Sequence, residues 1–224
     1  MILGILTAVL FALVSAVFFT RRLPAGSLVK RVAHQIHKPL GYALIALIAL
    51  HLSLTLKLFY QRPLAVYLLG FAMLACAIIC ALTNTLFRSY KRGMLIHRIA
   101  ALCMAVLLVG HVAFCITSLN TYKREVAAIT IGQTEVSALA DGVYEGGCDV
   151  GYISAKVRVT VADGKIESID LLEHRNERGA AGEGVLERIV SEQTVGVDAV
   201  SSATNSSRVI EKAVENALQS QPVG

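Results

Sequence analysis

The sequence predicts a membrane all-α four-helix bundle followed by a small extracytoplasmic α+β domain. Hydrophobic residues make up 55% of the 224 residues, and they are concentrated in the first 119 positions, in runs long enough to cross a bilayer. After residue 140 the pattern changes to the short alternation of strands and the period of an amphipathic helix. We therefore expect three parts: residues 1–120 in the membrane, a linker at 121–140, and a domain at 141–224.

The first apolar run, 2–19, carries no charge and ends at Arg21 and Arg22. A cleavable signal peptide has its positive charge before the apolar stretch, so we interpret this run as an uncleaved helix whose N-terminus lies outside the cytoplasm. The connections that follow are short, which is typical of a compact bundle. The three further expected spans are 39–59, 64–87 and 95–119.

Lysine and arginine are unevenly distributed among the connections. Those after the first and third spans contain more basic residues than the connection after the second span and the segment after the fourth. Because basic connections stay on the cytoplasmic side, we expect a multi-pass protein of the cytoplasmic membrane, in contact with lipid, whose C-terminal domain is extracytoplasmic. The basic residues assigned to the cytoplasmic side are Arg21, Arg22, Lys30, Arg31, Lys38, Arg88, Lys91, Arg92 and Arg98.

Charge and cysteine content argue against two classes of function. The formal net charge is +5, but the basic residues flank apolar runs and form no patch with interleaved aromatic residues, so nucleic-acid binding is not indicated. The five cysteines are scattered singly, four of them within apolar runs, and no CxxC motif occurs. This pattern supports neither a disulfide framework nor an iron–sulfur or zinc site.

Histidines recur at a fixed interval in two of the apolar runs. His37 and His51 are 14 residues apart, as are His97 and His111, and the two sets are offset by 60 residues. The residues beside His37 and His97 match as well, so each half is interpreted as one helix hairpin of an internal repeat. Fourteen residues are nearly four helical turns, so both histidines of one helix point to about the same side.

Imidazoles that converge from facing helices are the axial ligands of low-spin b-type haem. We expect His37 to pair with His97 near the cytoplasmic surface and His51 with His111 nearer the outside, holding two haem b groups. Histidines that only hydrogen-bond within the bundle are the alternative. His34 is 17 residues before His51 and off the shared face, and we interpret it as an exposed loop histidine. With these features residues 1–120 resemble the di-haem core of the ferric reductase and NADPH oxidase superfamily.

The C-terminal part predicts a small α+β domain. Glycines at 146, 147 and 151 indicate turns. The run 153–161 alternates valines with polar residues, as a half-buried strand does, and the Asp-Gly pair at 163–164 indicates a hairpin turn. The other expected elements are a short helix or linker at 122–139, a second strand at 166–172, and helices at 185–189 and 209–218.

A polar run of small residues, 198–207, precedes the last expected helix and places Ser206 at its entrance. Backbone N–H groups and the positive end of the helix dipole stabilise a phosphate at such a position. An ordinary N-cap is the alternative, because Ser, Thr, Asn and Asp all favour cap positions.

The pattern Asp-x-x-Ser-x-Ala-Thr-x-Ser at 198–206 resembles the flavinylation motif of the FMN-binding domain family, which includes flavin subunits of the Rnf complex and of the sodium-pumping NADH:quinone oxidoreductase. The resemblance implies covalent FMN, joined through its phosphate to Ser206 by a flavin transferase that acts outside the cytoplasm. It also implies that Asp198, Ser201 and Thr204 are the remaining cofactor-binding and recognition positions. The family usually has glycine where this chain has Ser202, and glycine makes such a turn more freely.

Two further polar features have plain interpretations. Residues 179–184 contain a GxxGxG pattern that does not directly follow a strand, so a dinucleotide-binding fingerprint is not expected. Glu173 and His174 stand beside Arg175 at the end of the second strand. Contact with a flavin is one interpretation of this pair, and an exposed polar strand end is the preferred one.

Together these features predict electron transfer between the cytoplasmic side or the quinone pool and an outer FMN, through two b-type haems. No convincing NAD(P)H site occurs, so a redox partner protein or a quinone is expected to exchange electrons with the chain. An electron-transfer oxidoreductase subunit is thus favoured over a self-contained enzyme. One alternative is a membrane anchor or assembly subunit of a larger redox complex. Another is a terminal flavin reductase of a small acceptor.

Overall fold

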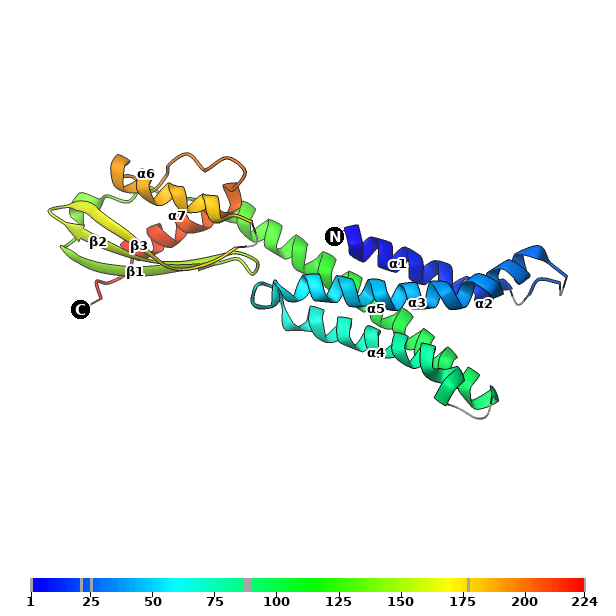
Figure 1. Ribbon diagram of the computed structural model, residues 1–224. Coiled ribbons are helices and arrows are strands. Elements are labelled where there is room, and N and C mark those ends of the chain that lie inside the picture. Colours follow the sequence, from blue (N-terminus) through cyan, green and yellow to red (C-terminus); the bar gives the residue numbers. More distant parts are fainter. Residues whose placement is uncertain (1, 21, 25, 87–89, 177, 224) are drawn as a thin grey trace. The chain divides into compact units, whose positions relative to one another are not determined.

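The computed structural model describes residues 2–20, 22–24, 26–86, 90–176 and 178–223 (Figure 1). Arg21 and Arg88, two of the basic residues behind the expected topology, lie outside these residues. The chain divides into two compact units. One comprises Met1–Phe59 with Pro63–Ile116, and the other comprises Tyr60–Arg62 with Thr117–Gly224.

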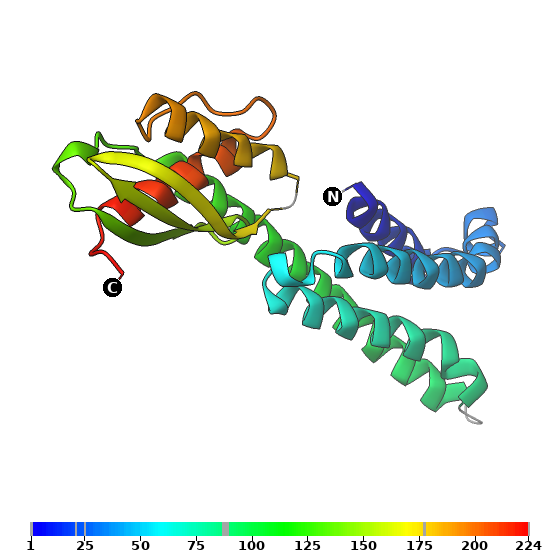
Figure 2. The ribbon, with the colours of Figure 1, turned by 60° about the vertical axis from the view of Figure 1, so that its left-hand side comes forward.

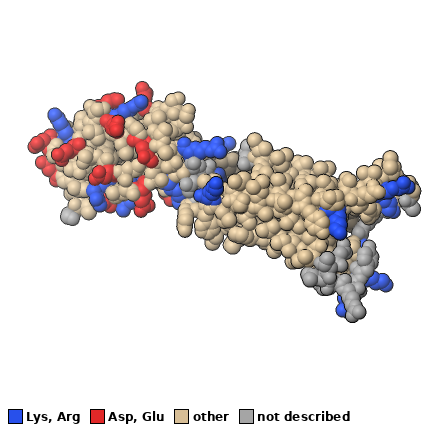
Figure 3. Space-filling view, in the orientation of Figure 1, with Lys and Arg blue, Asp and Glu red and all other residues tan. Residues whose placement is uncertain are grey.

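The first unit is built from long apolar helices. Among the described residues, four helical stretches are long and apolar enough to cross a membrane, which confirms the expected number: Ile2–Thr20, Leu28–Leu56, Leu64–Thr83 and Lys91–Ala128. No acidic residue precedes Glu125 in the sequence. Figure 3 shows a broad surface over these helices that carries neither Lys, Arg, Asp nor Glu. The elements are α1 (Ile2–Ser15), α2 (Val17–Thr20), α3 (Leu28–Leu56), η1 (Phe59–Gln61), α4 (Leu64–Leu86) and α5 (Tyr90–Ala128).

Helices α3 and α5 both begin before the expected spans 39–59 and 95–119, and α5 also ends later. Helix α3 begins at Leu28, so Pro39 lies inside it and not at its start. A helix start is the usual place for proline, because proline has no N–H to donate, and this is why the expected span began there. The segment before Pro39 is rich in residues that favour helix, and α3 packs against α1 and α2. His34 is exposed as expected, but on a helix and not in a loop.

The second unit is a three-stranded antiparallel sheet covered by one long helix (Figure 2). Helix α7 packs against β1 and β2, while α6 packs against β3 and α7. The expected hairpin at 163–164 is present, with both residues in the left-handed conformation at φ 51° and 69°. The elements are η2 (Val136–Ala138), β1 (Gly142–Asp149), β2 (Ser154–Ala162), β3 (Lys165–Arg175), η3 (Ala180–Gly184), α6 (Val185–Glu192) and α7 (Thr204–Leu218).

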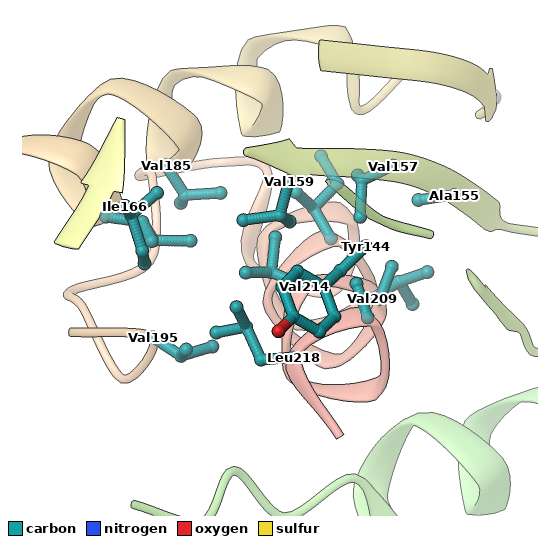
Figure 4. Packing of buried hydrophobic residues seen from close by; sticks show 14 of the residues in the cluster. Tyr144, Ala155, Val157, Val159, Ile166, Val185, Val195, Val209, Val214 and Leu218 are labelled. Carbon is teal, nitrogen blue, oxygen red and sulfur yellow. The ribbon is translucent and has the colours of Figure 1, made fainter. Parts of the chain in front are cut away.

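The core of this unit lies between the sheet and α7. The alternating valines of β2 point toward the helix, and none of Val157, Val159 and Val161 is more than 1% exposed. Figure 4 shows Val157 and Val159 beside Val209 and Val214 of α7, and Val161 belongs to the same buried cluster. The alternation in the sequence therefore predicted the buried face of β2 correctly.

Strand β1 is where the sequence-based prediction was wrong. Gly146 and Gly147 were expected in a turn, but they lie within β1, paired with Val157 and Lys156 of β2. The reason is the close approach of α7. A Cβ at position 146 would overlap the backbone of Ala217 and lie 2.6 Å from the carbonyl oxygen of Ala213. Glycine is used here to let a helix backbone touch a strand backbone.

Candidate functional site

Ser206 lies in the first turn of α7, which begins at Thr204 with Ala203 as its cap residue. The first amides of a helix have no partner within the helix, so they are free to bind an anion. The Ser206 side chain is only 1% exposed. Its Oγ is buried with no hydrogen-bond partner among the described residues. A buried hydroxyl without a partner is uncommon, and it points to a group that the site is shaped to receive.

A glycine-containing segment, Gly179–Gly184, covers this serine. A Cβ at Gly179 would overlap Ser206 Oγ, and a Cβ at Gly182 would lie 2.7 Å from Ser206 Cβ. Both positions therefore need glycine for close approach to α7. Sequence reasoning did not assign this segment to the site, because its glycines meet Ser206 only after the chain has folded.

A pocket opens beside Ser206. Its volume is about 400 Å³, and every residue that lines it belongs to the second unit. The described residues of the lining include two arginines and no carboxylate. Of the motif residues expected to bind the cofactor, Thr204 and Ser206 line the pocket, whereas Asp198 and Ser201 do not. The lining residues are Arg62, Leu119, Tyr122, Tyr152, Ile153, Arg178, Gly179, Ser202, Ala203, Thr204, Asn205 and Ser206.

The turn that leads into α7 is held by Ser207 and not by Ser206. Ser207 Oγ accepts a hydrogen bond from the Val200 amide at 3.0 Å and donates to the Ala203 carbonyl at 3.2 Å. Asp198 is exposed, and its backbone carbonyl accepts from Arg188 Nη1 at 2.9 Å. Ser202 has a φ of 67°, the left-handed conformation that glycine adopts without strain. Ser202, which stands where the flavinylation motif usually has glycine, thus adopts a backbone conformation that favours glycine.

His174 differs from its expected place at an exposed strand end. Its side chain is only 3% exposed, and Nδ1 donates to Glu183 Oε1 at 2.7 Å. The 3-10 turn η3 folds back onto the end of β3 and brings Glu183 over the imidazole. Glu173 is exposed, as expected. The described residues give no contact between this pair and Ser206.

The helical unit brings His37 and His97 together. Their ring centroids are 5.9 Å apart with an interplanar angle of 66°. His37 Nδ1 lies 3.2 Å from the Val14 carbonyl oxygen, and His97 Nδ1 lies 3.1 Å from that of Cys80. A carbonyl oxygen can only accept, so Nδ1 carries the hydrogen in both rings, and Nε2 carries the lone pair in the neutral form.

His51 and His111 form a second, less constrained pair. They are close enough to interact electrostatically. Gly4 of α1 lies against the His51 ring, where a Cβ would be 3.3 Å from Cε1. His111 Nδ1 is buried near the Val66 carbonyl without meeting hydrogen-bond geometry, and Nε2 lies 3.7 Å from Cys115 Sγ.

An apolar layer separates the two histidine pairs. It consists of Leu44 and Ile48 of α3, Ala77 of α4 and Met104 of α5, all buried. Met104 is midway between His97 and His111 in the sequence. No group of three or more His, Cys, Asp or Glu side chains that could hold a bare metal ion occurs among the described residues.

Comparison with known proteins relates most of the second unit to a known family. Residues 151–219 match the model of the FMN-binding domain family. An uncharacterized protein of Treponema pallidum (strain Nichols) is 34% identical over 129 residues, which cover 53% of this chain and 36% of that protein. The chain thus spans about a third of the length of this curated relative. No solved structure matches. The chain therefore combines an N-terminal part with four apolar helices and a domain whose residues 151–219 match the FMN-binding domain family.

Proposed function

We propose that the protein transfers electrons across the cytoplasmic membrane, between the cytoplasmic side or the quinone pool and an FMN that is covalently bound outside. The observation that carries the proposal is the buried, unpartnered Oγ of Ser206 at the helix entrance of an FMN-binding domain. FMN in this place accepts electrons singly or in pairs. A covalent bond keeps the cofactor from being lost to the extracellular phase.

Ser206 Oγ is the acceptor in the attachment step. It attacks the FMN phosphorus of a flavin dinucleotide that a flavin transferase presents, forming the new P–O bond. The pyrophosphate bond breaks, adenylate leaves, and the hydroxyl proton passes to solvent. The amides of the first turn of α7 hold the resulting phosphodiester. Thr204 lines the same pocket, while Asp198 is exposed where a transferase can recognise it.

The test is the Ser206→Ala substitution, expressed together with the transferase. We expect a folded protein without flavin fluorescence on a denaturing gel. Ser207→Ala is the matched control: its hydroxyl only holds the turn, so this variant should keep the flavin at a stability cost of about 1 kcal/mol. A flavin mass on the peptide of the Ser206→Ala variant would contradict the assignment.

The paired histidines suit two b-type haems. His37 and His97, whose ring centroids lie 5.9 Å apart, would together hold one of them, and His51 and His111 would hold the other. In the first pair, the Nδ1 hydrogen bonds to Val14 and Cys80 orient the rings and leave Nε2 to coordinate. Haem, when bound, supplies single-electron transfer, and a redox partner protein or a quinone exchanges electrons with it.

An absorption spectrum of the purified protein before and after dithionite tests the haem part. We expect two haems per chain, one of which is lost in His51→Ala and in His111→Ala. His34→Ala should keep both, because His34 is an exposed residue outside the pairs. A flavinylated wild-type protein that carries no haem would contradict this part and favour a membrane anchor for a larger redox complex.

A further inference from the structure

We propose that the pocket beside Ser206 binds the flavin ring. Tyr122 and Tyr152 form the aromatic wall of this pocket, and Arg62 and Arg178 supply its positive charge. The inference rests on the proposed function, because it concerns where a flavin attached to Ser206 places its ring. It assigns roles to four residues outside the attachment motif.

The size and position of the pocket fit this ligand. A phosphodiester on Ser206 is short, so the rest of the flavin has to occupy space that Ser206 itself borders. The pocket has a volume of about 400 Å³, within the range of sites that hold a cofactor-sized molecule. Residues 202–206, at the start of α7, and the two tyrosines are all part of its lining.

The aromatic wall is held in place before any ligand binds. The rings of Tyr122 and Tyr152 are 5.2 Å apart and tilted by 36°. Tyr122 Oη accepts a hydrogen bond from Asn205 Nδ2 at 2.8 Å, and Tyr152 Oη donates to Ser118 Oγ at 3.0 Å. Asn205 is the residue before Ser206, so this bond fixes the tyrosine wall relative to the attachment point. A preorganised wall of this kind suits a flat aromatic ligand.

The charge of the pocket fits as well. Arg62 lies over the Tyr152 ring at 4.1 Å, and Arg178 is an exposed residue of the lining. Among the described residues of the lining none is Asp or Glu. The phosphodiester carries one negative charge, and a reduced flavin ring can carry a second. Cations within a few ångströms stabilise the reduced form, so they raise the midpoint potential of the flavin.

The first measurement is the flavin fluorescence of the full-length flavinylated protein. Tyrosine in contact with a flavin quenches its fluorescence. We expect weak fluorescence in the native state, strong fluorescence after denaturation, and protection of the native flavin from iodide. Tyr122→Leu should restore native fluorescence while the gel shows unchanged covalent flavin. Tyr42→Leu, in α3 and outside the pocket, should change nothing.

The second measurement is an equilibrium redox titration. Arg62→Gln and Arg178→Gln should both lower the midpoint potential of the flavin, and Lys165→Gln, outside the lining, should not. A native wild-type flavin as fluorescent and as open to iodide as the denatured one would overturn the inference, whatever the variants do. Wild-type protein with no covalent flavin would instead refute the proposed function.

Discussion

Glu211 is a buried carboxyl whose ionisation should destabilise the FMN-binding domain. It lies on α7 and is 4% exposed, and its Oε1 has no hydrogen-bond partner among the described residues. Burial raises the pKa of Glu211 from 4.5 to about 7, with Arg208 acting in the opposite direction. Below the unfolded pKa both states are protonated and the residue costs nothing. As the pH rises toward the folded pKa, the unfolded state ionises first, so stability falls.

The size of the effect follows from the difference of the two pKa values. At 1.36 kcal/mol per unit, the loss above the folded pKa is at most about 3 kcal/mol. Glu211→Gln keeps the shape and removes the charge. In a domain of this size the variant should melt on the order of 10 °C higher at pH 8 and almost equally at pH 4.

This difference in melting temperature is measured by thermal unfolding of the full chain in detergent between pH 4 and 9. Tyrosine fluorescence and limited proteolysis follow the unfolding. Glu215→Gln is the matched control on the same helix, equally buried at 3%. Its Oε1 accepts from the Gly132 amide at 2.7 Å and its Oε2 pairs with Lys212, so its replacement should destabilise. If the melting temperature of Glu211→Gln changes with pH as that of the wild-type protein does, the ionised carboxylate of Glu211 is stabilised in the folded domain and the reasoning is wrong.

Three further predictions follow from the backbone and the charges. Gly146→Ala should destabilise the second unit by about 3 kcal/mol, because the new Cβ meets the backbone of α7, and urea unfolding measures the loss. Ser202→Gly should stabilise it by about 1 kcal/mol by relieving a φ of 67°, and an unchanged melting temperature would contradict this. A reporter fused after Lys123 should behave as exported, because the connections after the first and third spans contain more Lys and Arg, and cytoplasmic activity would refute the topology.

The sequence predicted those parts of the fold that depend on local pattern. The apolar runs indicated four helices, the valine alternation indicated the buried face of β2, and the apolar period after 208 indicated α7. What it did not predict depends on contacts between distant residues. Gly146 resembles a turn residue until α7, some 70 positions later, packs on it. Gly179 and Gly182 likewise become part of the site only when they meet Ser206.

The burial of Ser206 bears on the order in which the protein matures. A hydroxyl that is 1% exposed beneath two glycines cannot be reached by an enzyme, and those glycines have no side chains to turn aside. On the proposed function, flavin transfer therefore takes place while Gly179–Gly184 is lifted away from α7 or before it has docked. Once Gly179–Gly184 has docked over Ser206 of an unmodified chain, the transferase can no longer reach the hydroxyl. Flavinylation therefore has to take place before this last step of folding.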